Sequence, residues 1–167
     1  KGKSKQEILI STYICHPSMA NNELSGPIIS MSLIDYFRKK KLKKSLRFIF
    51  VPETIGAIGY LHKNLNNLKK NVIGGLQLTC VGDERQHSCL LTKYQDQLID
   101  KIILKNYKKL NIKFKKYTFL DRGSDERQFN SPHINLPIAS IFRSKYRTYP
   151  EYHTSKDNFK LVTLKGL

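Results

Sequence analysis

The chain has 167 residues, of which 30 are lysine or arginine and 13 are aspartate or glutamate, giving a formal net charge of +17. Its 40% of hydrophobic residues exclude a disordered basic tail, and no apolar run approaches the roughly 20 residues of a membrane span. The length suits one domain with its own core, so we expect a single domain over residues 1–167. We expect this domain to be a fragment truncated at both ends, because it opens at Lys1, close to a core strand, rather than at a methionine.

The first half of the chain alternates between strand-like and helix-like segments. Residues 7–15 are apolar and rich in isoleucine and threonine, which is typical of a buried strand. A stretch of turn formers then ends at Gly26. Apolar residues recur at helical spacing from Pro27, and the basic run 38–44 closes that helix where its dipole favours cations. The following segments predict, in order, a strand over 46–51, a helix over 58–68 and a strand over 71–81.

The second half of the chain continues the alternation. Its clearest element is a helix over 95–110, in which apolar residues form one stripe. The remaining segments predict a short edge strand over 88–92, a strand over 114–119 and a final buried strand over 136–142. A polar loop precedes this last strand and another one follows it.

Strands that alternate with helices predict an α/β domain: a mostly parallel, mixed central sheet with helices on both faces, in a three-layer sandwich. In such sheets ligands bind at the carboxyl ends of the strands. The first, second and third predicted strands are followed by His16, Glu53 and Asp83. Three further residues flank the last strand: Asp125, Glu126 and His153. Any one of them alone would most simply be a solvated loop side chain, but their convergence on one edge predicts a functional site.

Imidazole and carboxylate groups together are typical ligands of a divalent transition metal, most often zinc. A hydrolytic zinc site also needs a carboxylate that accepts a proton from water, and Glu53, directly after Pro52 at a strand end, is placed for this role. The other three histidines lack such placement, and we assign them no ligand role: His62, His87 and His133.

Five stretches carry a family resemblance, and they run in the family's order across nearly the whole chain. They are CHPSMANNELSGP (15–27), VPETIGAIGYL (51–61), LTCVGDER (78–85), GSDERQF (123–129) and YPEYHTSKDNF (149–159). At these positions the sequence resembles the co-catalytic zinc aminopeptidases, the group of bacterial leucyl aminopeptidase and, more distantly, glutaminyl cyclase. It is most similar to an aminopeptidase-like branch found with bacterial polysaccharide and surface-glycan biosynthesis genes.

The resemblance implies roles for individual residues. His16 and His153 match the first and last metal histidines, and Glu53 matches the general base. Asp83 lies near the family's aspartate ligand, although Thr79 could align there instead. The pair Ser124-Asp125 resembles the serine and aspartate that flank the substrate pocket.

The sequence departs from the family where two metal ions would be held together. The bridging aspartate would lie in residues 20–26, which carry Asn21 and Asn22, and an asparagine supplies no carboxylate. Glu23 could replace it only with altered geometry. Thr54 stands for a second glutamate ligand and Ser18 for the aspartate that orients the first histidine. We therefore expect one zinc ion rather than two, held by His16, Asp83 and His153.

An aminopeptidase also needs a carboxylate that binds the free amine of its substrate. The candidates are Glu23, Asp125 and Glu126, although exposed loop carboxylates are equally common. Ser124 and Tyr152 are further candidates for contact with substrate, while tyrosines that simply cover a sheet edge, as Tyr146 and Tyr149 could, are as common. Arg127 and Arg143 could meet an anionic group, but an ion pair within the chain is the simpler interpretation.

Three functions compete. The first is a metal-dependent hydrolase of the aminopeptidase type, which uses zinc-activated water and Glu53 to cleave an amide in a small peptide, amino-acid or amino-sugar substrate. The second is a catalytically degenerate module that binds a peptide or glycan precursor without hydrolysis. The third is a nucleic-acid binder, and only the net charge favours it. Arginine, the residue that most often reads bases, supplies only 7 of the 30 basic residues, which speaks against this function. We therefore expect neither nucleic acid nor a membrane as partner.

The three cysteines, Cys15, Cys80 and Cys89, are an odd number without a CxxC pair. This pattern indicates neither a disulfide framework nor a structural zinc knuckle. A reducing bacterial cytoplasm is the simplest location for such a chain.

Overall fold

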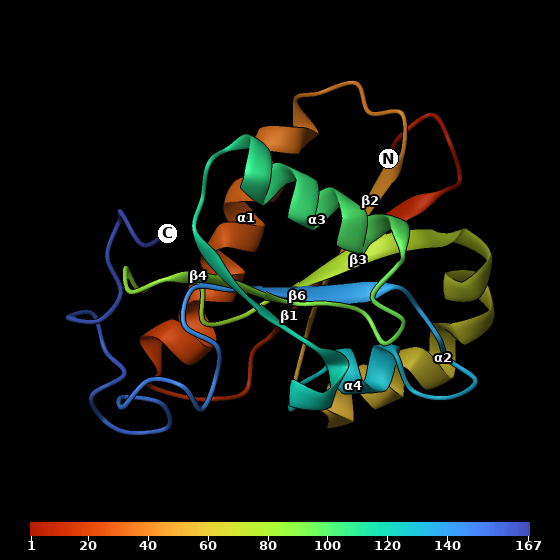
Figure 1. The fold of residues 1–167 in the computed structure, drawn as a ribbon. Coiled ribbons are helices and arrows are strands. Elements are labelled where there is room, and N and C mark those ends of the chain that lie inside the picture. The colour runs from red at the N-terminus through yellow and green to blue at the C-terminus, as the bar shows by residue number, and fades with distance from the viewer.

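The computed structural model describes all 167 residues and arranges six strands in one sheet, in the order β2-β1-β3-β6-β4-β5 (Figure 1). The strands are β1 (Glu7–Tyr13), β2 (Ser45–Val51), β3 (Val72–Leu78), β4 (His87–Leu90), β5 (Phe114–Tyr117) and β6 (Ile138–Phe142). Strands β2, β1, β3 and β6 are mutually parallel, β4 runs antiparallel to β6, and β5 is parallel to β4. The carboxyl ends of four strands therefore lie on one edge of the sheet.

Helices cover both faces of this sheet. The longer ones are α1 (Ser25–Arg38), α2 (Ile55–Asn71) and α3 (Leu98–Lys109), and α4 (Glu126–Phe129) is a single turn. Figure 1 shows α1 and α3 above the sheet, and α2 and α4 below it. The chain also contains two short helical turns, a π-helical turn over Ala20–Leu24 and a 3-10 turn over Phe119–Asp121. The expected α/β sandwich with a mostly parallel, mixed sheet is confirmed.

The position of the fourth strand differs from the prediction. The segment 88–92 was expected at the edge of the sheet, whereas β4 lies between β6 and β5. Ser88, Cys89 and Leu90 are all fully buried, as an inner strand requires. The edge belongs to β5, whose Lys115 and Lys116 are exposed, and lysines at an edge discourage pairing with other chains.

Several element ends also differ from the predicted ones. Helix α1 stops at Arg38, so the lysines over 39–44 follow the helix instead of forming its last turns. The same helix begins at Ser25 and includes Gly26. Glycine is needed at this position because a Cβ would overlap Thr12 Oγ1 and the carbonyl of Leu78. Helix α2 begins at Ile55, and α4 forms within a segment expected to be loop. Short turns of this kind depend on tertiary contacts that periodicity does not contain.

Apolar side chains fill both spaces between the sheet and its helices. Successive residues of β6 point to opposite faces of the sheet. Ile138 packs with α2 and α4 on one face, whereas Ala139 packs with α3 on the other. The first layer is centred on Leu9, Leu61, Leu68 and Phe129, and the second on Cys89, Leu91, Ile99, Ile103 and Tyr107. None of the helices combines the length and the apolar character that crossing a bilayer would require.

Phe129 anchors the one-turn helix α4 to the core, and its side chain is fully buried. We expect Phe129→Ala to lower the free energy of unfolding by about 3–5 kcal/mol, because it leaves a cavity beneath the sheet. Urea denaturation followed by circular dichroism measures this change. The matched control Leu120→Ala, at a side chain that is 87% exposed, should change stability by less than about 0.5 kcal/mol. Equal losses in the two variants would contradict the packing described here.

Candidate functional site

His16 lies in the loop after β1, with a carboxylate at each nitrogen of its ring. Its Nδ1 is 3.1 Å from Glu23 Oε2, which also accepts the backbone N–H of His16 at 2.8 Å. Its Nε2 is 3.5 Å from Glu53 Oε2. Glu23 thus contacts this ring, whereas Ser18 stands where the resemblance implies an aspartate. Burial raises the pKa of Glu23.

Glu53 is held by its neighbours at the end of β2. Its Oε1 accepts a hydrogen bond from the Ser124 hydroxyl, and this hydroxyl accepts one from Gln77 Nε2 at 2.9 Å. The next residue, Thr54, has φ 61° and ψ −70°, a conformation that β-branched residues rarely adopt. Its backbone N–H donates to Asp125 Oδ1 at 2.7 Å. The strained turn and these hydrogen bonds fix the direction of the Glu53 side chain.

His153 comes from the C-terminal segment and reaches the same place. The centre of its ring is 5.1 Å from that of His16, and its ring stacks on Tyr152 at 4.0 Å with an angle of 16°. Burial and the neighbouring His16 lower the pKa of His153, which favours the neutral form of the imidazole. A neutral imidazole is the form that binds metal ions.

Asp125 and Glu126 are both fully buried, but their surroundings differ. Glu126 accepts hydrogen bonds from the backbone of Gly123 and Ser124 and from the hydroxyls of Tyr146 and Ser140. Its role is therefore to hold the loop. Asp125 Oδ2 has no hydrogen-bond partner, and burial raises the pKa of Asp125 to about 7.

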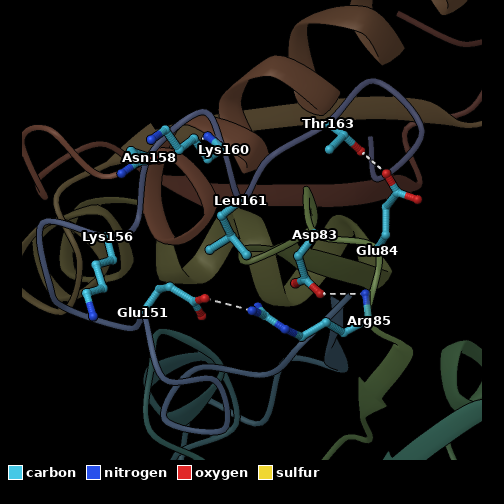
Figure 2. A pocket seen from close by; sticks show the side chains of 9 residues that line it. All are labelled: Asp83, Glu84, Arg85, Glu151, Lys156, Asn158, Lys160, Leu161 and Thr163. Atoms are coloured by element: carbon cyan, nitrogen blue, oxygen red, sulfur yellow. Dashed lines mark hydrogen bonds and ion pairs between the residues drawn. The ribbon is translucent and has the colours of Figure 1, made fainter.

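Asp83 belongs to a different network. Its two oxygens accept hydrogen bonds from Asn21 Nδ2 at 3.0 Å, from the Ser144 amide and hydroxyl at 2.9 and 2.8 Å, and from the Arg85 amide at 3.0 Å. No hydrogen bond joins it to either histidine. It borders a hollow of about 550 Å³ that contains neither His16 nor His153 and is crossed by the 2.7 Å ion pair between Arg85 and Glu151 (Figure 2). The structure thus brings together the two histidines and Glu53, but not Asp83.

The amides at the expected bridging position are also engaged. Asn22 Oδ1 accepts from the Tyr13 hydroxyl at 2.8 Å, and Asn21 Oδ1 accepts from the Gly82 amide at 2.8 Å. Thr79, the alternative to Asp83 in the resemblance, contacts Tyr13 and donates to the Asn22 carbonyl at 3.2 Å. Buried hydroxyls and amides therefore occupy the region where a second ion would need carboxylates.

Two residues of this region do not stand out from the sequence patterns. Cys15, counted only as a free thiol, has its Sγ 3.4 Å from His16 Nδ1. Asp157 is fully buried, and its carboxylate accepts the backbone N–H groups of Asn21 at 2.6 Å and Asn22 at 3.0 Å. The available signal for Asp157 was its place in the HTSKD stretch, as a lone acid four residues after His153.

We expect Asp157→Ala to destabilise the protein by about 3 kcal/mol, because two buried N–H groups lose a charged acceptor. The free energy of unfolding from urea titration measures this change. Asp35→Ala provides the control, since Asp35 is exposed on α1 and pairs only with Arg38 and Lys39. A loss that is no larger for Asp157→Ala than for this control would contradict the assigned role.

The residues present fit a zinc ion. His16 Nε2, His153 and the nearby carboxylates are the nitrogen and oxygen donors that zinc binds. The buried Asp125 oxygen without a hydrogen-bond partner gives a second observation in favour, because burial of a bare carboxylate oxygen is costly unless something pairs with it.

Solved structures of zinc aminopeptidases share this architecture. BSAP, a zinc aminopeptidase from Bacillus subtilis, has a TM-score of 0.81 at 16% identity, with 98% of this chain and 43% of that one covered. The aminopeptidase from Aneurinibacillus sp. strain AM-1 has a TM-score of 0.81 at 20% identity, with 99% and 42% covered. At these identities the likeness shows that the chain shares the fold of these proteins.

More similar relatives come from Clostridium acetobutylicum. One, provisionally named polysaccharide biosynthesis protein with aminopeptidase-like domain, is 44% identical over all of this chain and 38% of its own length. The crystal structure of a provisionally named peptidase from that species has a TM-score of 0.95 at 43% identity, with 99% and 39% covered. The chain thus spans about two fifths of the length of these relatives. The family described as a domain of unknown function, DUF4910, matches residues 1–167, and the chain belongs to it.

These comparisons confirm the resemblance stated from the motifs, both to the zinc aminopeptidases and to the branch named for polysaccharide biosynthesis.

Proposed function

We propose that this module belongs to a zinc-dependent hydrolase that cleaves an amide bond beside a free amine, in a small peptide or in an amino-acid or amino-sugar amide. One observation carries the proposal. His16 Nε2 lies 3.5 Å from Glu53 Oε2, and the His153 ring lies beside that of His16. Two imidazoles and a fixed carboxylate in such proximity are the parts that hydrolytic zinc chemistry requires.

His16 and His153 would hold one zinc ion. With its proton on Nδ1, His16 donates a hydrogen bond to Glu23 and keeps its lone pair on Nε2, which faces Glu53. Asp83, expected as the third ligand, has both oxygens occupied, so Asp125 with its free Oδ2 is the better candidate. That oxygen could instead bind the substrate amine. The metal content of Asp125→Asn distinguishes these roles, since only the loss of a ligand lowers it.

When bound, zinc supplies a Lewis acid that makes water a nucleophile at neutral pH. Glu53 accepts the proton of the attacking water at Oε2 and passes it to the leaving amine. The Ser124 hydroxyl donates to Oε1 and keeps the carboxylate in this orientation. Tyr152 stacks on His153 and shields one side of that ring from water.

A second function, ligand binding without hydrolysis, has its own observation in favour. The side chains of Asn21 and Asn22 are neutral and fully engaged in hydrogen bonds, and Thr54 supplies no carboxylate. If no zinc is held, His16, Glu53 and His153 would instead bind a peptide or glycan precursor through hydrogen bonds. Metal content and turnover separate the two functions.

We expect the purified protein to contain about one zinc ion per chain. In a Cys15→Ser background, which removes the thiol 3.4 Å from His16 Nδ1, His16→Ala and His153→Ala should each lose most of this zinc, measured by inductively coupled plasma mass spectrometry after dialysis. His62→Ala, which changes an exposed histidine of α2, should keep it. Wild-type protein that takes up no zinc on titration would contradict the catalytic proposal and favour the binding module.

We expect Glu53→Gln to keep zinc but to lower kcat by about 10²–10⁴-fold, because the amide cannot accept the proton from water. A panel of aminoacyl-anilides and N-acyl amino sugars provides the substrates. Glu84→Gln, at an exposed acid bonded to Thr163, is the control and should keep full activity. Full activity of Glu53→Gln would mean that another group is the base.

A further inference from the structure

Cys15 is the exposed one of the three free thiols, and it lies directly before His16 in the loop after β1. Its Sγ is 3.4 Å from His16 Nδ1 and accepts the backbone N–H of Glu53 at 3.1 Å. This N–H would stabilise a thiolate at the same position. The thiol has no part in the function proposed above.

Three donor atoms of different chemistry meet at this point. Cys15 Sγ, His16 Nδ1 and Glu23 Oε2 all lie within 4.8 Å of one another, and Nδ1 is 3.4 Å from the sulfur and 3.1 Å from the oxygen. Tetrahedral zinc with bonds of about 2.3 Å to sulfur and about 2.0–2.1 Å to nitrogen and oxygen would separate such atoms by about 3.3–3.6 Å. Both distances from Nδ1 therefore lie within a few tenths of an ångström of this spacing.

The same three residues line a hollow of about 370 Å³ that is open to solvent. Its other walls are largely apolar, including Pro17, Leu24 and the side chain of Met19. An ion bound by the three side chains would keep one position facing this hollow, where water can complete a tetrahedral shell. Apolar walls strengthen the electrostatic attraction between a cation and its ligands.

We propose that Cys15, His16 and Glu23 form a second zinc site, which binds through Nδ1 of His16 and does not include His153. An ion at this second site regulates the proposed catalytic site by competing for His16. Only this second part rests on the proposed function. A neutral imidazole has one free lone pair, because its other nitrogen carries the proton. Binding at Nδ1 releases the thiol proton to solvent and moves the imidazole proton to Nε2, which then faces Glu53 Oε2. An ion at the thiolate site thus excludes an ion at Nε2.

A thiolate ligand selects among cations. Zinc, cobalt and cadmium bind sulfur well, whereas magnesium and calcium prefer oxygen ligands. The site should therefore take zinc from a mixture that contains an excess of magnesium.

The test is titration of the metal-free protein with Co²⁺, followed by absorption spectroscopy. We expect a thiolate-to-cobalt charge-transfer band in the near ultraviolet. Cys15→Ser should abolish this band, while Met19→Leu, which removes the other sulfur of the hollow, should keep it. His153→Ala should keep the band as well, because His153 is no ligand of this site.

A second readout uses the thiol itself. Alkylation of Cys15 by iodoacetamide, followed by peptide mass spectrometry, should slow about tenfold when zinc is present at ten times its dissociation constant. Magnesium at the same concentration should give no protection.

Cobalt that binds without a thiolate band, and equally well to Cys15→Ser, would overturn the thiolate site and leave the His153 site standing. A band that depends on Cys15 but disappears in His153→Ala would also overturn the second site, because Cys15 and His153 would then bind the same ion. If the wild-type protein binds neither cobalt nor zinc, both proposals fail together.

Discussion

The buried carboxylate of Asp157 is the constraint on which the site depends. It accepts the backbone N–H groups of Asn21 and Asn22, and the Tyr149 hydroxyl donates to it at 3.2 Å. These hydrogen bonds attach the irregular C-terminal segment to the loop between β1 and α1. His153, four residues earlier, is thereby brought beside His16, although 136 residues separate the two in the chain. Because the segment has no sheet or helix of its own, this charged acceptor replaces regular backbone pairing.

His16 is the point where the two proposed activities of this region meet. Its ring has a carboxylate on each side, Glu23 at Nδ1 and Glu53 at Nε2. The proton can stay on only one nitrogen of the neutral ring, and the other nitrogen then points its lone pair at the neighbouring groups. Metal binding at Nδ1 and metal binding at Nε2 are thus alternatives within a single residue, and the proton lies on the nitrogen that holds no metal. In the two proposals Cys15 favours an ion at Nδ1, and His153 favours an ion at Nε2.

The bulk charge of the chain says little about this site. Many of its lysines lie directly after α1, in the last turns of α2 and α3 and on the edge strand β5, where they are exposed to solvent. The acids are few, and the buried ones have specific tasks: Asp83 and Asp157 join loops, Glu126 holds the turn before α4, and Asp125 keeps a free oxygen near Glu53. Burial of carboxylates is costly unless hydrogen bonds compensate for it. The paired acids are therefore structural, and the unpaired oxygen is the more informative one for function.

The sequence by itself determined the class of fold and the edge of the sheet at which His16, Glu53 and His153 meet. Alternating strands and helices predict a parallel sheet, and in such a sheet His16, Glu53 and residues around the last strand must reach the same edge. Tertiary structure decided the rest. Only there does Glu23 replace the expected aspartate beside His16, Asp83 turn towards Ser144, and β4 enter the interior of the sheet. The physical reason is that side-chain partners depend on backbone conformations such as the positive φ of Thr54 and on contacts between distant loops. Local periodicity records which face of an element is buried, but not which buried donor meets which acceptor.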